Sequence, residues 1–115
     1  MNSKTEISLL YDFYGELLKT SQQQVVELYV NEDLSLSEVA ELLGISRQGV
    51  RDSLTRAEKK LLEYESKLGL LSAYRKRREH EGAIRGLIAQ IKQTEGCGAV
   101  LPRLNEIEDL LRGDD

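Results

Sequence analysis

The sequence predicts an all-α protein, and three observations support that fold class. Aromatic residues make up 5% of the 115 residues and Trp is absent, so aliphatic residues must form most of the core. Apolar residues recur at intervals of three and four, which is typical of helices, and no segment alternates as a strand does. One Pro, Pro102, interrupts the chain. Amphipathic helices are therefore expected almost throughout.

Two helices are expected before residue 35. Residues 7–18 form a single apolar stripe, which consists of Ile7, Leu10, Tyr11, Tyr14, Leu17 and Leu18. Thr20 and Ser21 are each followed three residues later by Gln, so either can cap a second helix. That helix carries Val25, Val26, Tyr29 and Val30 and ends at the polar segment 31–34.

Residues 35–54 predict two helices joined by a tight turn. Ser35 and Glu38 have the spacing of a capping box, and Gly44 suits the left-handed backbone that ends a helix. Ser46 is expected to cap the next helix, while Ala40 is small where the two helices would cross. The apolar residues that fix this crossing are Val39, Leu43, Ile45, Val50 and Leu54, with Ile45 pointing into the core. This spacing is typical of a DNA-binding helix-turn-helix, with an ordinary helical hairpin as the alternative.

Three further helical stretches are expected towards the C-terminus. A long helix carries Val50, Leu54, Ala57 and Leu61, and the same stripe extends to Tyr64, Leu68, Leu71 and Tyr74 unless Gly69 bends or divides it. A second stretch carries Ile84, Leu87, Ile88 and Ile91, and a last helix begins at Pro102 with Leu104, Ile107, Leu110 and Leu111. These stripes offer more apolar surface than a three-helix core needs, so a homodimer is expected.

The expected organisation has three parts. Residues 1–61 form the helix-turn-helix domain, and residues 62–112 form a C-terminal helical extension that packs on it or makes a dimer interface. Residues 113–115 are expected to fray.

Charge is distributed unevenly along the chain. The net charge is -4, from 16 Lys and Arg against 20 Asp and Glu. Residues 35–80 nevertheless carry 10 basic and seven acidic side chains, a local balance of +3 between flanks of -4 and -3. The positive segment coincides with the predicted helix-turn-helix and the helix after it, which favours an anionic partner such as DNA.

The candidate DNA-binding residues follow from placing Val50 and Leu54 inward at about 100 degrees per residue. Arg and Gln suit base edges, and cations and hydroxyls suit phosphates. The set comprises Ser37, Ser46, Arg47, Gln48, Arg51, Thr55, Arg56 and Lys59, with Lys60 as a further phosphate contact. Asp52 lies within this face, where it either accepts from a cytosine amine or is neutralised by Arg56. A merely solvated face is the alternative interpretation.

Four consecutive cations form a second basic feature: Arg75, Lys76, Arg77 and Arg78. Such a run suits phosphates or an acidic protein surface, and solvation at a helix end is the alternative.

Several classes of protein are not expected. One Cys, Cys97, and one His, His80, supply neither a disulfide nor a metal site, and no cofactor is predicted. Without a phosphate-binding glycine loop or a catalytic constellation, an enzyme is not expected. No apolar run is long enough to span a bilayer, so a cytoplasmic protein without membrane insertion is predicted.

Residues 14–61 resemble the fourth conserved region of bacterial sigma factors, which binds a promoter element. The resemblance lies in residues 21–28, in the run that ends at Ser46, and in residues 50–61. It implies DNA-contacting positions at Arg47, Gln48, Arg51 and Thr55. The remainder of a sigma factor is missing, so a complete sigma factor is not expected.

The whole chain more closely resembles the YlxM family of small bacterial helix-turn-helix proteins, through residues 9–18, 46–52 and 63–70. This resemblance implies a sigma-region-4-like helix-turn-helix bundle followed by C-terminal amphipathic helices, and a gene commonly located beside those of the signal recognition particle. The role it implies is regulatory, or accessory to the pathway of that particle, and the leading hypothesis is a non-enzymatic DNA-binding regulatory protein. The alternative is a module that contacts the particle's proteins or RNA without sequence-specific DNA binding.

Overall fold

The structure, a computed structural model, describes residues 2–112, and every regular element in that range is helical. The all-α prediction is therefore confirmed for the described residues. The predicted frayed tail, residues 113–115, lies outside them. The principal helices are α1 (Lys4–Tyr14), α2 (Thr20–Val26), α3 (Leu36–Leu43), α4 (Arg47–Leu68), α5 (Leu70–Lys92) and α6 (Leu101–Arg112). Short 3-10 segments follow α1 (Gly15–Leu17) and precede α6 (Cys97–Ala99), and a π-helical turn (Glu27–Asn31) continues α2.

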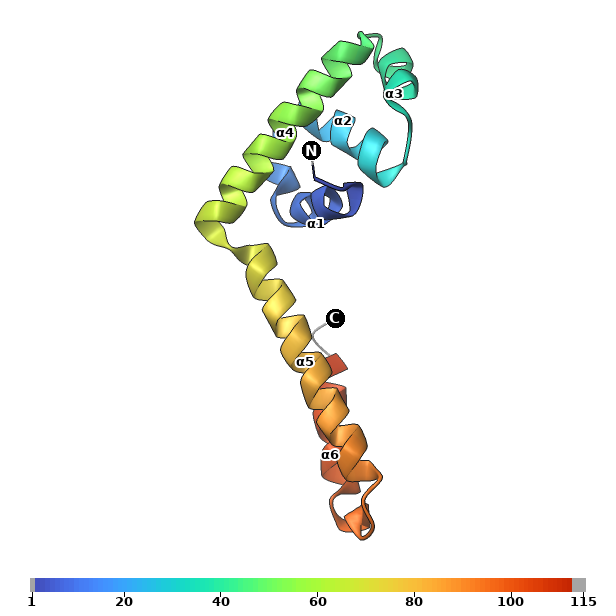
Figure 1. Ribbon diagram of the computed structural model, residues 1–115, viewed down its shortest axis with the longest axis vertical. Coiled ribbons are helices and arrows are strands. Elements are labelled where there is room, and N and C mark those ends of the chain that lie inside the picture. Colours follow the sequence, from blue (N-terminus) through green and yellow to red (C-terminus); the bar gives the residue numbers. More distant parts are fainter. Residues whose placement is uncertain (1, 113–115) are drawn as a thin grey trace. The chain divides into compact units, whose positions relative to one another are not determined.

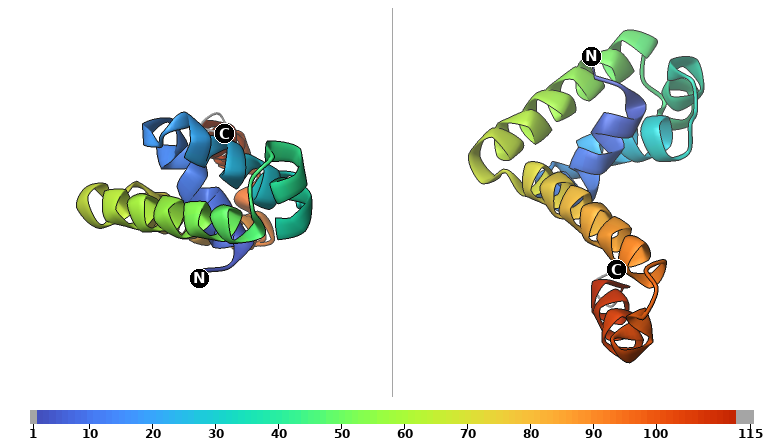
Figure 2. Two further views of the ribbon diagram at one scale, coloured as in Figure 1. Left: turned by 90° about the horizontal axis from the view of Figure 1, so that it is seen from above. Right: turned by 60° about the horizontal axis from the view of Figure 1, so that its bottom comes forward.

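The chain divides after Ser72 into two compact units. In the first unit, α4 runs across α1 and α2, and α3 packs beside the N-terminal end of α4 (Figure 1). In the second unit, α6 folds back alongside α5 (Figure 2). Lys92 of α5 donates a hydrogen bond of 2.9 Å to Asn105 of α6 and forms an ion pair with Glu108.

The core of the first unit collects one apolar face from each of its helices. Its buried apolar residues are Ile7, Leu10 and Tyr14 of α1, Leu18 after the following 3-10 turn, Val25 and Val26 of α2, Val39 and Ala40 of α3, Val50, Leu54, Ala57 and Leu61 of α4, and Leu71 at the start of α5. The inward stripe predicted for α4 is thus confirmed over its first four turns. Removing this apolar surface from water is the main contribution to the stability of the unit.

The predicted caps of α2 were wrong. Thr20 is already helical, and Lys19, whose backbone is extended, occupies the cap position without a side-chain hydrogen bond. The Gln23 amide instead donates to the carbonyl oxygens of Gly15 and Leu18, at 2.8 and 3.2 Å. A side chain inside the helix therefore satisfies the backbone before it, which a search for Ser or Thr caps does not detect.

The stripe predicted for residues 7–18 is also interrupted. α1 ends at Tyr14, and the following 3-10 turn leaves Leu17 more than half exposed while Leu18 is buried. The two conformations have different periods, so one helical stripe cannot hold both leucines in the core.

Gly69 divides the long C-terminal stripe rather than bending it. Its backbone is left-handed, with φ of 63°, and it ends α4 after Leu68. Leu71 is buried and Leu68 is exposed, so the stripe does not continue unbroken. The last helix begins at Leu101, one residue before Pro102, which lies in its first turn, where a missing amide hydrogen is tolerated.

Candidate nucleic-acid interface

A capping box begins α3. The Ser35 hydroxyl accepts from the Glu38 amide at 3.0 Å, and the Glu38 carboxylate accepts from the Ser35 amide at the same distance. The hydrogen bond from the Ser35 amide, followed by the interaction with the Ser35 side chain, holds the pKa of the Glu38 carboxyl below its ordinary value. The predicted capping box is therefore confirmed, and it fixes where the first helix of the motif starts.

The turn between α3 and α4 depends on Gly44. Its backbone is left-handed, with φ of 66° and ψ of 33°, a conformation that glycine adopts without strain. The Ile45 amide then donates to the Ala40 carbonyl at 3.1 Å. Ser46 accepts from the Gly49 amide at 2.9 Å, which confirms it as the cap of α4.

Buried small and β-branched residues fix the crossing of the two helices. Val39 and Val50 are fully buried, and Ala40 lies with them where the two helices of the motif approach. The prediction that Ile45 points into the core was wrong, because its side chain is 44% exposed. It lies along the first turn of α4 near Gly49, on the outside of the turn.

The predicted DNA-binding residues of α4 lie on its solvent-facing side. Every side chain of the set is exposed in the first unit, namely those of Ser37 on α3, Ser46 at the cap, and Arg47, Gln48, Arg51, Thr55, Arg56 and Lys59 on α4. The Thr55 hydroxyl donates to the Arg51 carbonyl at 3.0 Å and keeps its lone pairs for a ligand. The structure thus gathers donors for bases and phosphates along one helix.

Asp52 is engaged by Gln48 rather than by Arg56. The Gln48 side-chain amide donates to the Asp52 carboxylate at 2.9 Å, one turn along the helix. This bond orients the Gln48 amide, whose oxygen and second N–H remain available to an adenine edge.

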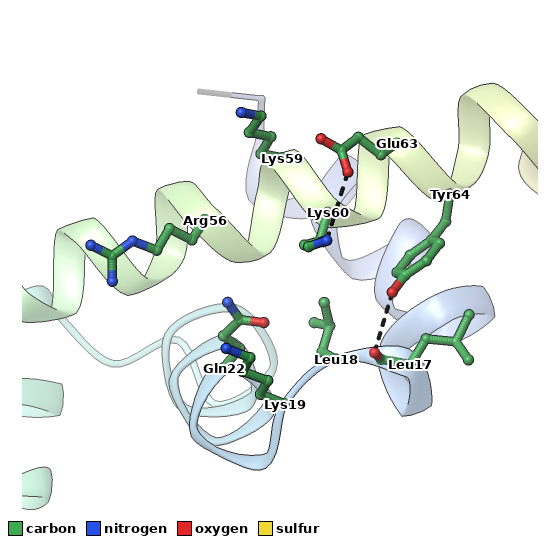
Figure 3. Close-up of a pocket in the computed structure, with 9 residues that line it drawn as sticks. All are labelled: Leu17, Leu18, Lys19, Gln22, Arg56, Lys59, Lys60, Glu63 and Tyr64. Atoms are coloured by element: carbon green, nitrogen blue, oxygen red, sulfur yellow. Dashed lines mark hydrogen bonds and ion pairs between the residues drawn. The ribbon is translucent and has the colours of Figure 1, made fainter.

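The structure also brings together cations that the sequence does not associate. Lys19, before α2, lines the same cleft as Arg56, Lys59 and Lys60 of α4 (Figure 3). Lys19 belongs to the segment whose net charge is -4, and about 40 residues of chain separate it from the others. No local pattern therefore indicates this grouping.

The second basic feature lies on α5, within the helix rather than at its end. Arg75, Lys76, Arg77 and Arg78 are all exposed. The Arg77 guanidinium lies 4.0 Å from the Glu81 carboxylate and 5.8 Å from the centre of the Tyr74 ring. Part of the positive charge of these four residues is therefore already paired within α5.

Residues 2–112 contain neither a cluster of metal-binding side chains nor a helix that could span a membrane. No three His, Cys, Asp or Glu side chains are grouped as metal ligands would be. None of the described helices has the length and apolar character to cross a membrane. Cys97 is half-buried, and its thiol donates to the Lys92 carbonyl at 3.3 Å.

The α3–turn–α4 unit, with its polar face on α4, defines a helix-turn-helix protein. The chain belongs to the family described as "Putative helix-turn-helix protein, YlxM / p13 like", whose sequence profile matches residues 1–97. The resemblance drawn from residues 9–18, 46–52 and 63–70 is thereby confirmed.

Relatives of the chain share the name UPF0122 protein. One from Thermoanaerobacter sp. (strain X514) is 43% identical over 101 residues, covering 88% of this chain and 86% of the relative. One from Clostridium novyi is 40% identical over 110 residues, covering 96% and 93%. A shorter match, 54% identical over 69 residues, to a protein of Desulforamulus reducens covers 60% of this chain and 59% of that relative.

Proposed function

We propose that this chain is a non-enzymatic regulatory protein that binds duplex DNA through the N-terminal half of α4. The observation that carries the proposal is the α3–turn–α4 unit, in which Gly44 sets the turn and Val50 and Leu54 face inward. That packing leaves the opposite side of α4 to solvent. An exposed helix of this kind fits the major groove, about 12 Å wide.

The side chains of the first three turns are suited to base edges. Arg47 and Arg51 are exposed and can donate two hydrogen bonds to guanine, and Gln48 can bind adenine with its oriented amide. Ser37, Ser46, Arg56 and Lys59 surround them and can hold phosphates. With a local charge of only +3, we expect binding of modest affinity that depends on salt.

The test is selection of bound duplexes from a random pool, followed by titration of the selected duplex and a scrambled one. Arg51→Ala is expected to weaken binding to the selected duplex about tenfold, and more than to the scrambled one, because it removes a base contact worth about 1–3 kcal/mol. Arg51 is exposed, so the unfolding free energy is expected to stay the same. Equal affinities of wild type and variant for both duplexes would contradict base recognition by Arg51.

A homodimer completes the proposal, and the α5–α6 hairpin is the expected interface. Among residues 73–112, only Ile88 and Leu104 supply buried apolar side chains. Two such side chains cannot offset the entropy of ordering about 40 residues. The exposed apolar residues of the two helices include Ile84, Leu87, Ile91, Ile107 and Leu110. A second copy presents the same face by symmetry, and two α4 helices would then bind two half-sites of an inverted repeat.

The second candidate function is a module that contacts proteins or RNA of the signal recognition particle. The observation that favours it is the exposed run from Arg75 to Arg78, which lies outside the helix-turn-helix. RNA contact would use phosphates and shape, since α4 offers no exposed aromatic side chain for base stacking. Pull-down with the purified particle, repeated after reversing the four charges, distinguishes the candidates. Charge-dependent capture without selective DNA binding supports this second function.

A further inference from the structure

A cleft of about 450 Å³ lies between α4 and the corner that joins α1 to α2 (Figure 3). Tyr64 closes one end, where its hydroxyl donates to the Leu17 carbonyl at 3.4 Å. Leu18, which is buried, anchors the corner to the core. The two walls are therefore held in place by the fold of the first unit.

Four of the nine residues that line the cleft are cations. Arg56 and Lys60 extend from α4, and Lys19 and Gln22 stand on the α2 side (Figure 3). Lys59 also borders the cleft, but its side chain points away from it (Figure 3). The only carboxylate in the lining is that of Glu63, which lies 3.9 Å from the Lys60 ammonium.

Most of this positive charge has no counter-charge among the residues that the structure describes. Without Lys59, which points away, the cations Lys19, Arg56 and Lys60 and the carboxylate of Glu63 give the cleft a net charge of +2. Lys60 and Glu63 are both about half exposed, so their ion pair is weak. Lys19 and Arg56 have no ion-pair partner among residues 2–112. Like charges gathered on a concave surface repel one another, and a bound anion relieves that repulsion.

The donors match phosphate oxygens in particular. A guanidinium presents a planar fork that fits two phosphate oxygens, and an ammonium adds a point charge. The Gln22 amide adds neutral N–H donors on the opposite wall. A cationic ligand would find only the Glu63 carboxylate there, while Leu17, Leu18 and Tyr64 supply the apolar part of the lining.

The position of the cleft along α4 indicates which phosphates it meets. A groove about 12 Å wide spans only two to three turns of a helix that rises 1.5 Å per residue. If residues 47–55 lie in the groove, Arg56 and Lys60 lie at its edge, where a phosphate strand runs. We propose that the cleft formed by Lys19, Arg56 and Lys60 binds phosphates of the DNA strand bordering the groove, an inference that rests on the proposed function.

The experiment measures affinity and its salt dependence for the full chain. Wild type and the variants Lys19→Gln, Arg56→Gln and Glu63→Gln are titrated onto the selected and the scrambled duplex between 50 and about 200 mM salt. Lys67→Gln is the matched control, because it removes one exposed cation from the same helix outside the cleft. Circular dichroism checks that each variant remains helical.

We expect the first two variants to lose about fivefold to tenfold in affinity for both duplexes equally, at 0.1 M salt. The log-log salt slope should fall by about 0.9 for each lost phosphate contact, and by about twice that when Lys19→Gln and Arg56→Gln are combined in one chain. Glu63→Gln removes the competing carboxylate and should bind both duplexes more tightly. A substitution that merely disturbs the fold would not increase affinity.

The outcomes separate this inference from the proposed function. If the cleft variants keep the affinity and slope of Lys67→Gln while wild type selects its duplex, the cleft inference is wrong and DNA recognition stands. If wild type binds both duplexes equally with a slope that depends on the cleft, base recognition is wrong and the cleft stands. If wild type binds neither duplex, both are overturned, and an acidic protein segment becomes the ligand to test.

Discussion

The hydroxyl of Tyr14 donates a hydrogen bond of 2.6 Å to the carboxylate of Glu65, across 51 residues of sequence. The same carboxylate accepts from the amides of Leu71 and Ser72, at 2.9 and 3.1 Å, and the Tyr14 hydroxyl accepts from the Leu70 amide at 3.0 Å. The Glu65 side chain, near the end of α4, thus satisfies free amides in the first turn of α5. Because Tyr14 is itself buried, its two hydrogen bonds connect this junction to the core of the first unit.

Tyr14→Phe is expected to lower the free energy of unfolding by about 1–3 kcal/mol, because it leaves the Leu70 amide and part of the Glu65 carboxylate without partners. Tyr14 is 1% exposed, so water cannot replace the hydroxyl. Urea unfolding measures the change. Tyr11→Phe is the matched control, since its hydroxyl bonds the exposed Glu27 at 2.7 Å and should matter less. Equal losses for the two variants would contradict a special role for the buried bond.

Stability is also expected to fall at alkaline pH, and Tyr14 should contribute to the loss. Burial, followed by its hydrogen bond to Glu65, raises the pKa of the Tyr14 hydroxyl above its ordinary value. A group whose folded pKa is raised stabilises the fold below its unfolded pKa, about 10 for Tyr, and this contribution is lost as pH rises beyond that value. Urea midpoints between pH 8 and about 11 should decline less steeply in Tyr14→Phe than in wild type. Parallel curves would show that Tyr14 does not carry the effect.

The cap of α3 gives a prediction that separates two neighbouring serines. Ser35→Ala removes the acceptor of the Glu38 amide and should lower the free energy of unfolding by about 1 kcal/mol. Ser37→Ala, an exposed change in the same helix, should alter it by less than about 0.5 kcal/mol. If Ser37 contacts phosphate, its variant weakens DNA binding instead. Urea unfolding and duplex titration of both variants measure the two effects separately.

The sequence predicted the parts of this fold that depend on local spacing. The capping box at Ser35, the left-handed Gly44 and the inward stripe from Val50 to Leu61 follow from patterns within a few residues, because caps and helical faces are local properties. The Glu65 junction and the grouping of Lys19 with Arg56 had no such pattern. Both depend on how α1 and the start of α2 pack against α4, which local periodicity does not specify.

Exposure of Ile45 illustrates a different limit. Its hydrophobicity and its place after Gly44 favoured the core, but the left-handed turn directs its side chain along the outside of α4. Apolar character indicates that a side chain can be buried. The geometry of the turn determines whether it is.

Asp52→Asn is expected to strengthen DNA binding severalfold at 0.1 M salt, because it removes a negative charge from the proposed DNA-binding face of α4. Asparagine keeps an oxygen that can accept from Gln48, so the orientation of the Gln48 amide should persist. Titration of the selected duplex measures the change, with the exposed Glu16→Gln as the charge-matched control. Weaker binding with an altered base preference would show instead that the Asp52 carboxylate itself accepts from a base.

If the protein is a homodimer, a charged substitution among the exposed apolar residues of α5 and α6 should change its mass in solution. Sedimentation of the wild type should give about twice the 13.0 kDa of one chain, and Leu87→Glu or Leu110→Glu should give a single chain. These leucines are 59% and 69% exposed in one copy, so a dimer would have to desolvate the new carboxylate. Leu42→Glu, at a 66% exposed position on α3, is the control and should leave the mass unchanged.

The same variants link assembly to DNA recognition. Two α4 helices related by a two-fold axis bind an inverted repeat, so the monomeric Leu87→Glu chain should lose affinity for a two-site duplex but keep its affinity for a single half-site. Leu87 lies in the second unit, outside the helix-turn-helix, so its replacement does not alter the α4 side chains proposed to contact bases. A wild-type mass of one chain at every concentration would contradict the dimer. Selection of a single unrepeated site would show that one copy of α4 is enough.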